Sequence, residues 1–217
     1  MNSVIAEKQY IVSKLGVPYD SLSQSYLRSE TALTTTSVIP FQLQRGQVAS
    51  PIVTEQLLEL NDQFVITHIG FGLKQIGADS PTTLQQLNAN VLTYNDTNTF
   101  TGTNAVNVGA IYNTSLSMTI NRKDFIPAMP MRSFLRVPDT QTTTNADYTT
   151  SGIKQTNGYP NGLYSFYPTE VVLIDGRQTL DISLNLGASV TIAAIGTDPM
   201  IYATLETRGY LVVNSKS

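Results

Sequence analysis

The segment FVITHIGFGLKQI, residues 64–76, decides the fold class of this chain. Apolar side chains recur at every second position along it, which is the pattern of a half-buried β-strand. The alternation puts Phe64, Ile66 and His68 on one face of the predicted strand and Thr67 on the other. The two glycines that follow predict a bulge or a bend.

Strand patterns continue in both directions from this segment. Residues 34–44 are β-branched but contain Pro40, which favours an edge strand or an extended arm. Asp175-Gly176 is typical of a hairpin turn, so we predict three or four sequential antiparallel strands in the last third of the chain. The predicted strands besides 64–76 are 115–121, 133–137, 171–174, 179–186, 188–195 and 202–213.

These elements predict an all-β fold, a single jelly-roll-like antiparallel β-sandwich over residues 34–217 with a short helical N-terminal arm over residues 1–33. The Thr- and Asn-rich segments 94–109 and 139–160 are expected to be long loops at one end. Helical periodicity is confined to the start of the chain and to residues 81–90, which disfavours alternating strands and helices.

The N-terminal arm is predicted to hold two helices. Apolar residues at helical spacing run from residue 2 to Leu15, and Gly16 and Pro18 supply a stop. A second short helix is predicted after Asp20 and carries Leu22, Tyr26 and Leu27. The arm either packs on its own core or docks on a neighbouring subunit.

The composition excludes several kinds of chemistry. Of the 217 residues only 13% are charged, against a usual share of roughly 25%, and the net charge is −3. The chain has no cysteine, which excludes disulfides, thiolate metal sites and a thiol nucleophile. Because His68 is the single histidine, any histidine-based site must use it. No apolar run approaches the roughly 18 to 20 residues that span a bilayer.

We predict no catalytic residue, no cofactor and no bound metal. His68 is expected to be a core or interface residue; as a catalytic base it would need Asp62 or Glu59 to orient it. Carboxylate pairs for glycoside hydrolysis are scattered along strands and lack a recognisable spacing. A calcium site built from loop aspartates with Asn and backbone oxygens is physically possible, but the segment Asp96-Thr-Asn98 is too short a match to an ion-binding loop. The pairs considered are Glu170 with Asp175 and Asp181 with Glu206, and the loop aspartates are Asp96, Asp139, Asp147 and Asp198.

The segment NRKDFIPAMPMRSFLRVP, residues 121–138, combines cations with apolar side chains around two prolines. It is either a connection between core strands or a contact with another subunit, since methionine and arginine are common at interfaces. Nucleic-acid binding through its four cations is the weakest of the three interpretations, because no larger basic patch surrounds them.

The stretches IVTEQLLELNDQFVITHIGFGLKQI (52–76) and FTGTNAVNVGAIYNTSLSMTINRKDFIPAMPMRSFLRVP (100–138) resemble structural proteins of bacteriophage virions, of the jelly-roll capsid type. The resemblance implies a non-enzymatic capsid subunit that assembles with itself, and with other virion proteins, through its N-terminal arm and its loops. It implies a place in the virion, built in the host cytoplasm. Direct nucleic-acid binding is not expected, because residues 1–45 carry only four cations.

The alternative interpretation is a receptor- or carbohydrate-binding β-sandwich, such as a spike or fibre head or a capsid decoration protein. Its aromatic side chains would stack on sugar rings and its Asn and Thr groups would supply hydrogen bonds. The tyrosines expected to do so are Tyr148, Tyr159, Tyr164 and Tyr167.

Overall fold

The computed structural model describes residues 3–33, 36–48, 52–76, 82–96, 99–100, 104–136, 163–166, 171–187 and 200–212. The helices within these residues are α1 (Ser3–Leu15), α2 (Thr83–Asn88) and α3 (Asn104–Ile111), with 3-10 turns at Tyr19–Ser21, Arg45–Gln47 and Met131–Phe134. The strands are β1 (Ser23–Ala32), β2 (Val38–Phe41), β3 (Gln63–Ile76), β4 (Ser115–Ile120), β5 (Lys123–Pro130), β6 (Leu163–Ser165), β7 (Val172–Asp175), β8 (Leu180–Asn185) and β9 (Met200–Val212).

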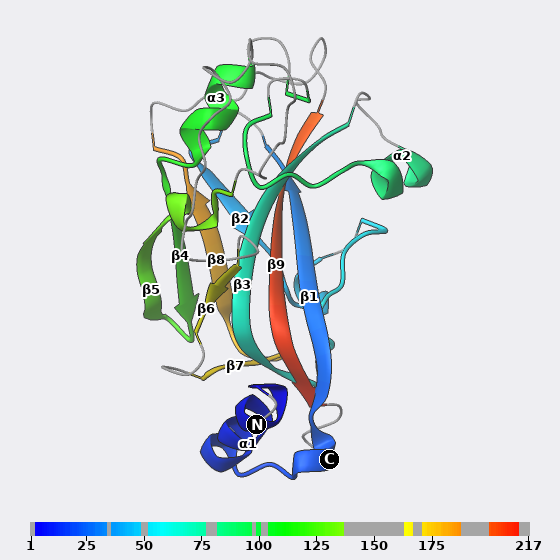
Figure 1. Ribbon diagram of the computed structural model, residues 1–217, viewed down its shortest axis with the longest axis vertical. Coiled ribbons are helices and arrows are strands. Elements are labelled where there is room, and N and C mark those ends of the chain that lie inside the picture. The colour runs from blue at the N-terminus through cyan, green and yellow to red at the C-terminus, as the bar shows by residue number, and fades with distance from the viewer. Residues whose placement is uncertain are drawn as a thin grey trace, which may run out of the picture.

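The strands form two sheets that are built from nested pairs (Figure 1). Sheet A has the order β1-β9-β3-β6, with β7 also paired to β3, and sheet B has the order β2-β8-β4-β5. In sequence order from the two ends of the chain towards its middle, β1 pairs with β9, β2 with β8, β3 with β6 and β7, and β4 with β5. All of these pairs are antiparallel. A folded double strand whose successive pairs alternate between two sheets is a jelly roll. The predicted all-β sandwich is therefore confirmed.

The core lies between the inner faces of the two sheets. Phe64 and Phe71 of β3 and Ile182 of β8 are buried there, and Phe71 meets Phe41 and Tyr112 edge to face at 6.4 and 6.0 Å between ring centroids. Burial of each such side chain stabilises the fold by roughly 1.5 to 3 kcal/mol.

A β-bulge at Thr67 interrupts the alternation of β3. In the pairing with β9, Ile66 is opposite Gly209 and His68 is opposite Arg208, so Thr67 is an extra residue. The residues beyond the bulge change faces, and His68 lies in a groove on the outer face of sheet A. The predicted placement of His68 on the same face as Ile66 is therefore wrong, and the bulge precedes the glycines that were expected to mark it.

Proline and a short bridge protect the sheet edges. Pro40 lies in β2, an edge of sheet B, which is the first of the two predicted placements, and the other edge strand, β5, contains Pro127 and Pro130. Proline offers no N–H to an incoming strand. The outer edge of β1 is partly covered, because Arg28 and Gln56 exchange two backbone hydrogen bonds of 2.8 and 3.0 Å.

The first predicted helix is confirmed as α1, which packs on one end of sheet A (Figure 1). Ile11 is buried in a small apolar cluster with Leu22, Val65 and Tyr210. The helix ends at Leu15, and the Gly16 that follows has a φ of 69°, the left-handed conformation that glycine adopts without strain. The helix thus packs on its own sheet, and a contact with a neighbouring subunit stays a prediction.

The second predicted helix, after Asp20, is wrong. The stretch SQSYLRSETA is β1, which pairs with β9 from Ser23 to Ala32, and only the 3-10 turn Tyr19–Ser21 precedes it. Pairing with a long partner strand outweighs the weak helical spacing of three apolar residues. Sheet A therefore takes in residues that were expected to belong to the helical arm.

The hairpin predicted at Asp175-Gly176 is also wrong. β7 pairs with β3 in sheet A, whereas β8 pairs with β2 and β4 in sheet B, so the two strands do not form a hairpin with each other. The strands that the structure describes after residue 170, which are β7, β8 and β9, are consequently not sequential antiparallel neighbours. A true two-residue hairpin joins β4 to β5 through Asn121 and Arg122, which both have positive φ.

The remaining predictions about single segments have mixed outcomes. The helix expected within residues 81–90 is confirmed as α2, whereas residues 131–134 form a 3-10 turn where a strand was expected to begin at 133. α3 overlaps the end of segment 94–109, which was expected to be a loop. The strand predicted at 188–195 and the loop predicted at 139–160 lie outside the described residues.

Candidate functional site

Four side chains form a row across the outer face of sheet A. Tyr26 on β1 is opposite Arg208 on β9, Arg208 is opposite His68 on β3, and His68 is opposite Ser165 on β6. Residues directly opposite on neighbouring strands lie on the same face of a sheet. All four line one groove of about 930 Å³, which we call the outer groove.

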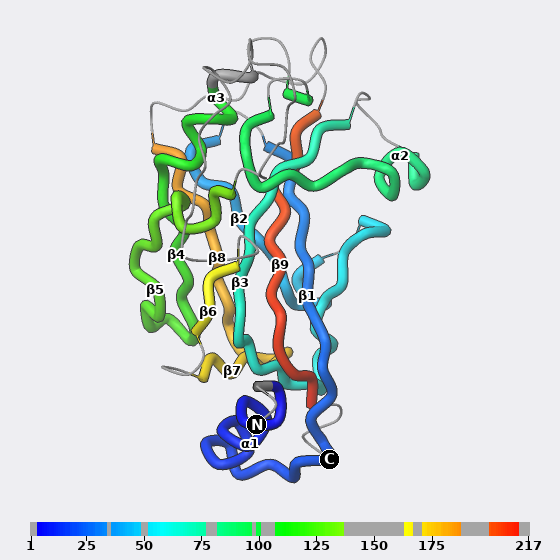
Figure 2. Tube along the Cα trace, viewed as in Figure 1, coloured from blue at the N-terminus to red at the C-terminus, as the bar shows by residue number. Residues whose placement is uncertain are grey.

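The next row along sheet A leads into a second, smaller hollow. Glu206 of β9 is opposite Arg28 on one side and Gly70 on the other, and Gly70 has no side chain to fill the space. A smaller hollow of about 120 Å³ adjoins there. Val91 closes its upper end, since a Cβ atom on Gly72 would lie 2.4 Å from Val91 Cγ1. Figure 2 shows the segment that follows α2 passing over the upper part of β3.

Arg208 and Glu206 form an ion pair within the outer groove. Arg208 Nε donates to Glu206 Oε1 at 2.8 Å, and the side chains are 55% and 30% exposed. Glu7 of α1 lines the lower end of the groove, and Arg28 lines the side near β1. With two carboxylates and two guanidinium groups, the lining has no net charge when His68 is neutral.

The hydrogen bonds around Thr67 assign the tautomer of His68. Thr67 Oγ1 lies 2.9 Å from His68 Nδ1 and 3.2 Å from the carbonyl oxygen of Arg208. A carbonyl oxygen can only accept, so the threonine hydroxyl donates to it and accepts from Nδ1–H of the ring. In the neutral imidazole, Nε2 is then an acceptor.

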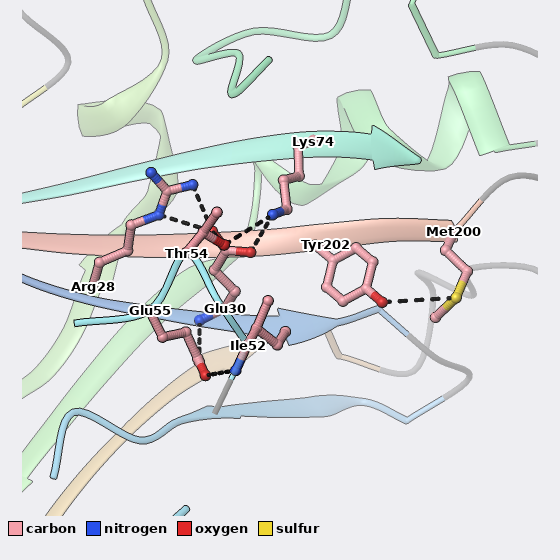
Figure 3. A network of polar contacts seen from close by, with 8 residues as sticks. All are labelled: Arg28, Glu30, Ile52, Thr54, Glu55, Lys74, Met200 and Tyr202. Atoms are coloured by element: carbon pink, nitrogen blue, oxygen red, sulfur yellow. Dashed lines mark hydrogen bonds and ion pairs between the residues drawn. The ribbon is translucent and has the colours of Figure 1, made fainter. Parts of the chain in front are cut away.

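A buried ion-pair network lies next to the outer groove (Figure 3). The carboxylate of Glu30 accepts from Arg28 Nε and from Thr54 Oγ1, each at 2.8 Å, and forms an ion pair with Lys74 Nζ. The side chains of Glu30 and Lys74 are fully buried. Their mutual contacts hold residues 52–56 against β1 and β3, which is a structural role.

Two titratable groups in this network have altered pKa values. Burial raises the pKa of Glu55, and this outweighs the opposing effect of the backbone N–H groups of Glu30 and Ile52, which donate to its carboxylate at 2.8 and 2.7 Å. Burial likewise raises the pKa of Tyr202, and the negative charge of Glu30 raises it further.

α2 projects from the sandwich (Figure 1). Its two leucines are exposed. Thr82 and Gln85 form a capping box that holds the first turn, and no residue of the helix is buried. Leu84 and Leu87 are 66% and 57% exposed, and Val91 just beyond the helix is also exposed. Residues three apart lie on the same helix face. We call Leu84 and Leu87 the α2 surface.

The structure separates the catalytic candidates that it describes, whereas Glu170, Asp139, Asp147 and Asp198 lie outside the described residues. The ring of His68 bonds to Thr67, and neither Asp62 nor Glu59 lines the outer groove with it. Asp181 is exposed on sheet B, whereas Glu206 lies on the outer face of sheet A, so the two do not form a catalytic pair. Among the described residues, no group of three His, Asp or Glu side chains is placed to hold a metal ion.

Segment 121–138 connects core elements as far as the structure describes it. Its cations do not form one patch, since Arg122 and Arg132 flank opposite ends of β5, roughly 25 Å apart along the strand. The apolar residues that were considered for a subunit contact are mostly buried in the core: Ile126, Met129, Met131 and Phe134.

The tyrosine cluster of the alternative interpretation is not supported at its one described member. Tyr164 is partly buried and packs edge to face on Phe166, with 5.3 Å between ring centroids. It is therefore no exposed platform for a sugar ring. Tyr148, Tyr159 and Tyr167 lie outside the residues that the structure describes.

Sequence reasoning missed Tyr26 and Arg208 as members of a site. Alternation along β1 points the side chain of Tyr26 away from the core, because its neighbour Leu27 is buried. Alternation along β9 likewise points Arg208 away from the core, because Leu205, three residues earlier, is buried. It carries no information on their pairing, which joins positions 182 residues apart and is visible only in the sheet register.

Comparisons with known proteins give no match: no protein-family model, no curated protein and no solved structure is significantly similar to this chain. Within the described part of the chain, no helix is both long enough and apolar enough to cross a membrane.

Proposed function

We propose that this chain is a structural subunit of a virion shell that assembles with copies of itself. Jelly rolls serve viral capsid proteins, lectins and cupins, so the topology alone does not choose among them. The resemblance of residues 52–76 and 100–138 to bacteriophage structural proteins favours the first of these classes.

The α2 surface is the observation that carries the proposal. Leu84 and Leu87 add nothing to the core, yet a capping box keeps their helix formed, and exposed apolar groups gathered on one element mark sites of contact with other molecules. The helix is uncharged over its whole length, TLQQLN, so identical copies can approach it without electrostatic repulsion.

The sheet edges suit a subunit that meets its neighbours through loops and helices. Proline in β2 and β5 discourages uncontrolled strand addition between copies, which would compete with an ordered lattice. The start of α1 offers a second contact, because Val4 and Ile5 are about 40% exposed. These features agree with assembly through an N-terminal segment and loops.

The test is the assembly state of the full chain, measured by light scattering after size-exclusion chromatography and by electron microscopy. The double variant Leu84→Ser/Leu87→Ser is compared with wild type and with Leu60→Ser, a control at a leucine that is 51% exposed in a turn away from α2. We expect wild type and the control to form large closed particles or discrete oligomers, and the double variant to lose them.

The double variant should fold normally, since neither leucine is buried, and circular dichroism verifies this. A wild-type chain that stays monomeric at high concentration would overturn the proposal. Assembly that is equal in wild type and the double variant would overturn the role of the α2 surface.

A further inference from the structure

The outer groove combines hydrogen-bond donors and acceptors at neighbouring positions. The guanidinium of Arg208 can only donate, and the carboxylate of Glu206 beside it can only accept. Glu206 binds Nε, which fixes the guanidinium and leaves its terminal amino groups as donors. In its neutral form, His68 adds an acceptor at Nε2 by the tautomer derived above. A ligand that satisfies all three must both donate and accept, as hydroxyl groups do.

The charge of the groove favours a neutral ligand. The carboxylates of Glu7 and Glu206 repel any phosphate, sulfate or carboxylate that approaches Arg208, and Arg28 is already paired with buried Glu30. A cationic ligand would meet Arg208 and Arg28 in turn. The lining therefore gives no net attraction to either sign of charge.

An aromatic ring stands at one end of this polar row. Tyr26 is 49% exposed and is directly opposite Arg208 in the sheet. An exposed tyrosine ring on a rigid strand offers an apolar face at a small cost in side-chain entropy. Pyranose rings have hydroxyl groups around the edge and C–H groups on the faces, so they match a tyrosine face beside paired donors and acceptors.

We propose that the outer groove binds a neutral carbohydrate, with Tyr26 packed on a sugar ring and with Arg208, Glu206 and His68 holding its hydroxyl groups. A volume of about 930 Å³ lies near the top of the range for small-ligand sites, so an oligosaccharide fits better than a single sugar. The site belongs to a single chain and does not depend on the proposed shell assembly. It would let a shell subunit attach to a polysaccharide surface.

The test is binding of the full chain to an array of immobilised neutral oligosaccharides of glucose, galactose, mannose and N-acetylglucosamine, with sulfated and sialylated glycans on the same array. Affinities of the bound glycans are then measured by calorimetry. We expect Tyr26→Ala and Arg208→Ala to weaken binding of a neutral glycan about tenfold or more. Arg208→Lys should weaken it as well, because lysine keeps the charge but loses the two-pronged donor geometry.

Matched controls separate the groove from the rest of the surface. Tyr19→Ala removes a tyrosine of similar exposure, 40%, and Arg132→Ala removes an exposed arginine; both lie outside the groove and should leave affinity unchanged. Affinity for the neutral glycan should also be insensitive to salt. Light scattering shows whether each variant assembles as wild type does, which keeps this result distinct from the test of assembly.

Three outcomes would overturn the proposal. The first is that wild type binds none of the neutral oligosaccharides on the array. The second is that it binds only the sulfated or sialylated glycans, which would make the groove an anion site. The third is that Tyr26→Ala and Arg208→Ala bind as wild type does, which would place the glycan elsewhere on the chain.

Discussion

Gly209 lies directly against the backbone of Val65, so that a Cβ atom on Gly209 would be 1.7 Å from the carbonyl oxygen of Val65. The two strands approach this closely beside the bulge at Thr67. The bulge in turn places His68 on the outer face of sheet A, opposite Arg208. A single glycine on β9 thus permits the turn of β3 that brings the one histidine of the chain into the outer groove.

Gly209→Ala is expected to destabilise the protein by about 3 kcal/mol, since the new methyl group meets backbone atoms that cannot turn aside as a side chain can. Urea unfolding followed by circular dichroism measures the loss. Gly46→Ala is the control: its Cβ would meet only the flexible end of Leu60, at 3.1 Å, and a much smaller effect is expected. Equal stability of the two variants would contradict the close approach at Gly209.

Lys74→Met is expected to cost about 3 kcal/mol of unfolding free energy, because it leaves the buried carboxylate of Glu30 without its fully buried partner. The double variant Lys74→Met/Glu30→Met removes both charges and should recover much of that loss. Chemical denaturation of the three proteins provides the measurement. A double variant less stable than Lys74→Met would show that the charges are not coupled as described.

Glu55 should make stability depend on pH. Its pKa is raised above the ordinary value of 4.5. At pH values between 4.5 and the raised pKa, the folded state therefore binds more protons than the unfolded state. The unfolding free energy contributed by Glu55 therefore falls as the pH rises through this window and returns as the pH is lowered. We expect wild type, compared with Glu55→Gln, to gain stability on acidification towards the ordinary pKa. Parallel stability–pH curves for the two proteins would exclude this effect.

Arg122→Gly is expected to stabilise the protein by roughly 0.5 to 1 kcal/mol, because Arg122 has a φ of 63° in the turn between β4 and β5. Glycine adopts this conformation without the steric cost that a Cβ atom brings, and Asn-Gly is the favoured pair for such a turn. The shift of the urea midpoint measures the gain. Lys123→Gly, one residue later within β5, is the control and should destabilise instead.

The fold class could be read from local patterns, and the errors arose where pairing between distant segments decided the result. Residues 115–121 and 179–186 alternate in the sequence and are strands in the structure, because burial of one face needs only a period of two. Residues 23–32 are a strand because β9 lies beside them, and no local signal reports a partner so far along the chain.

The turn at Asp175-Gly176 shows the same limit. Its sequence is that of a hairpin, but Gly176 is required for another reason: a Cβ atom there would be 2.1 Å from the carbonyl oxygen of Glu59. The glycine allows the chain to cross from sheet A to sheet B against a distant loop. A turn motif in the sequence predicts that the chain changes direction, but it does not predict which sheet contains the next strand.

What the sequence determined by itself is the all-β class, the helix that begins the chain, the proline-bearing edge strand β2 and the shortage of charge, since each of these rests on neighbouring residues or on composition. The tertiary structure alone decided the nesting of the strand pairs, the outer groove and the exposure of α2. Tyr26, Arg208, His68 and Ser165 come from four strands, and only the hydrogen-bond register of sheet A aligns them. A bulge of one residue, at Thr67, reverses the face that a local period of two assigns to His68, because side chains alternate from one residue to the next.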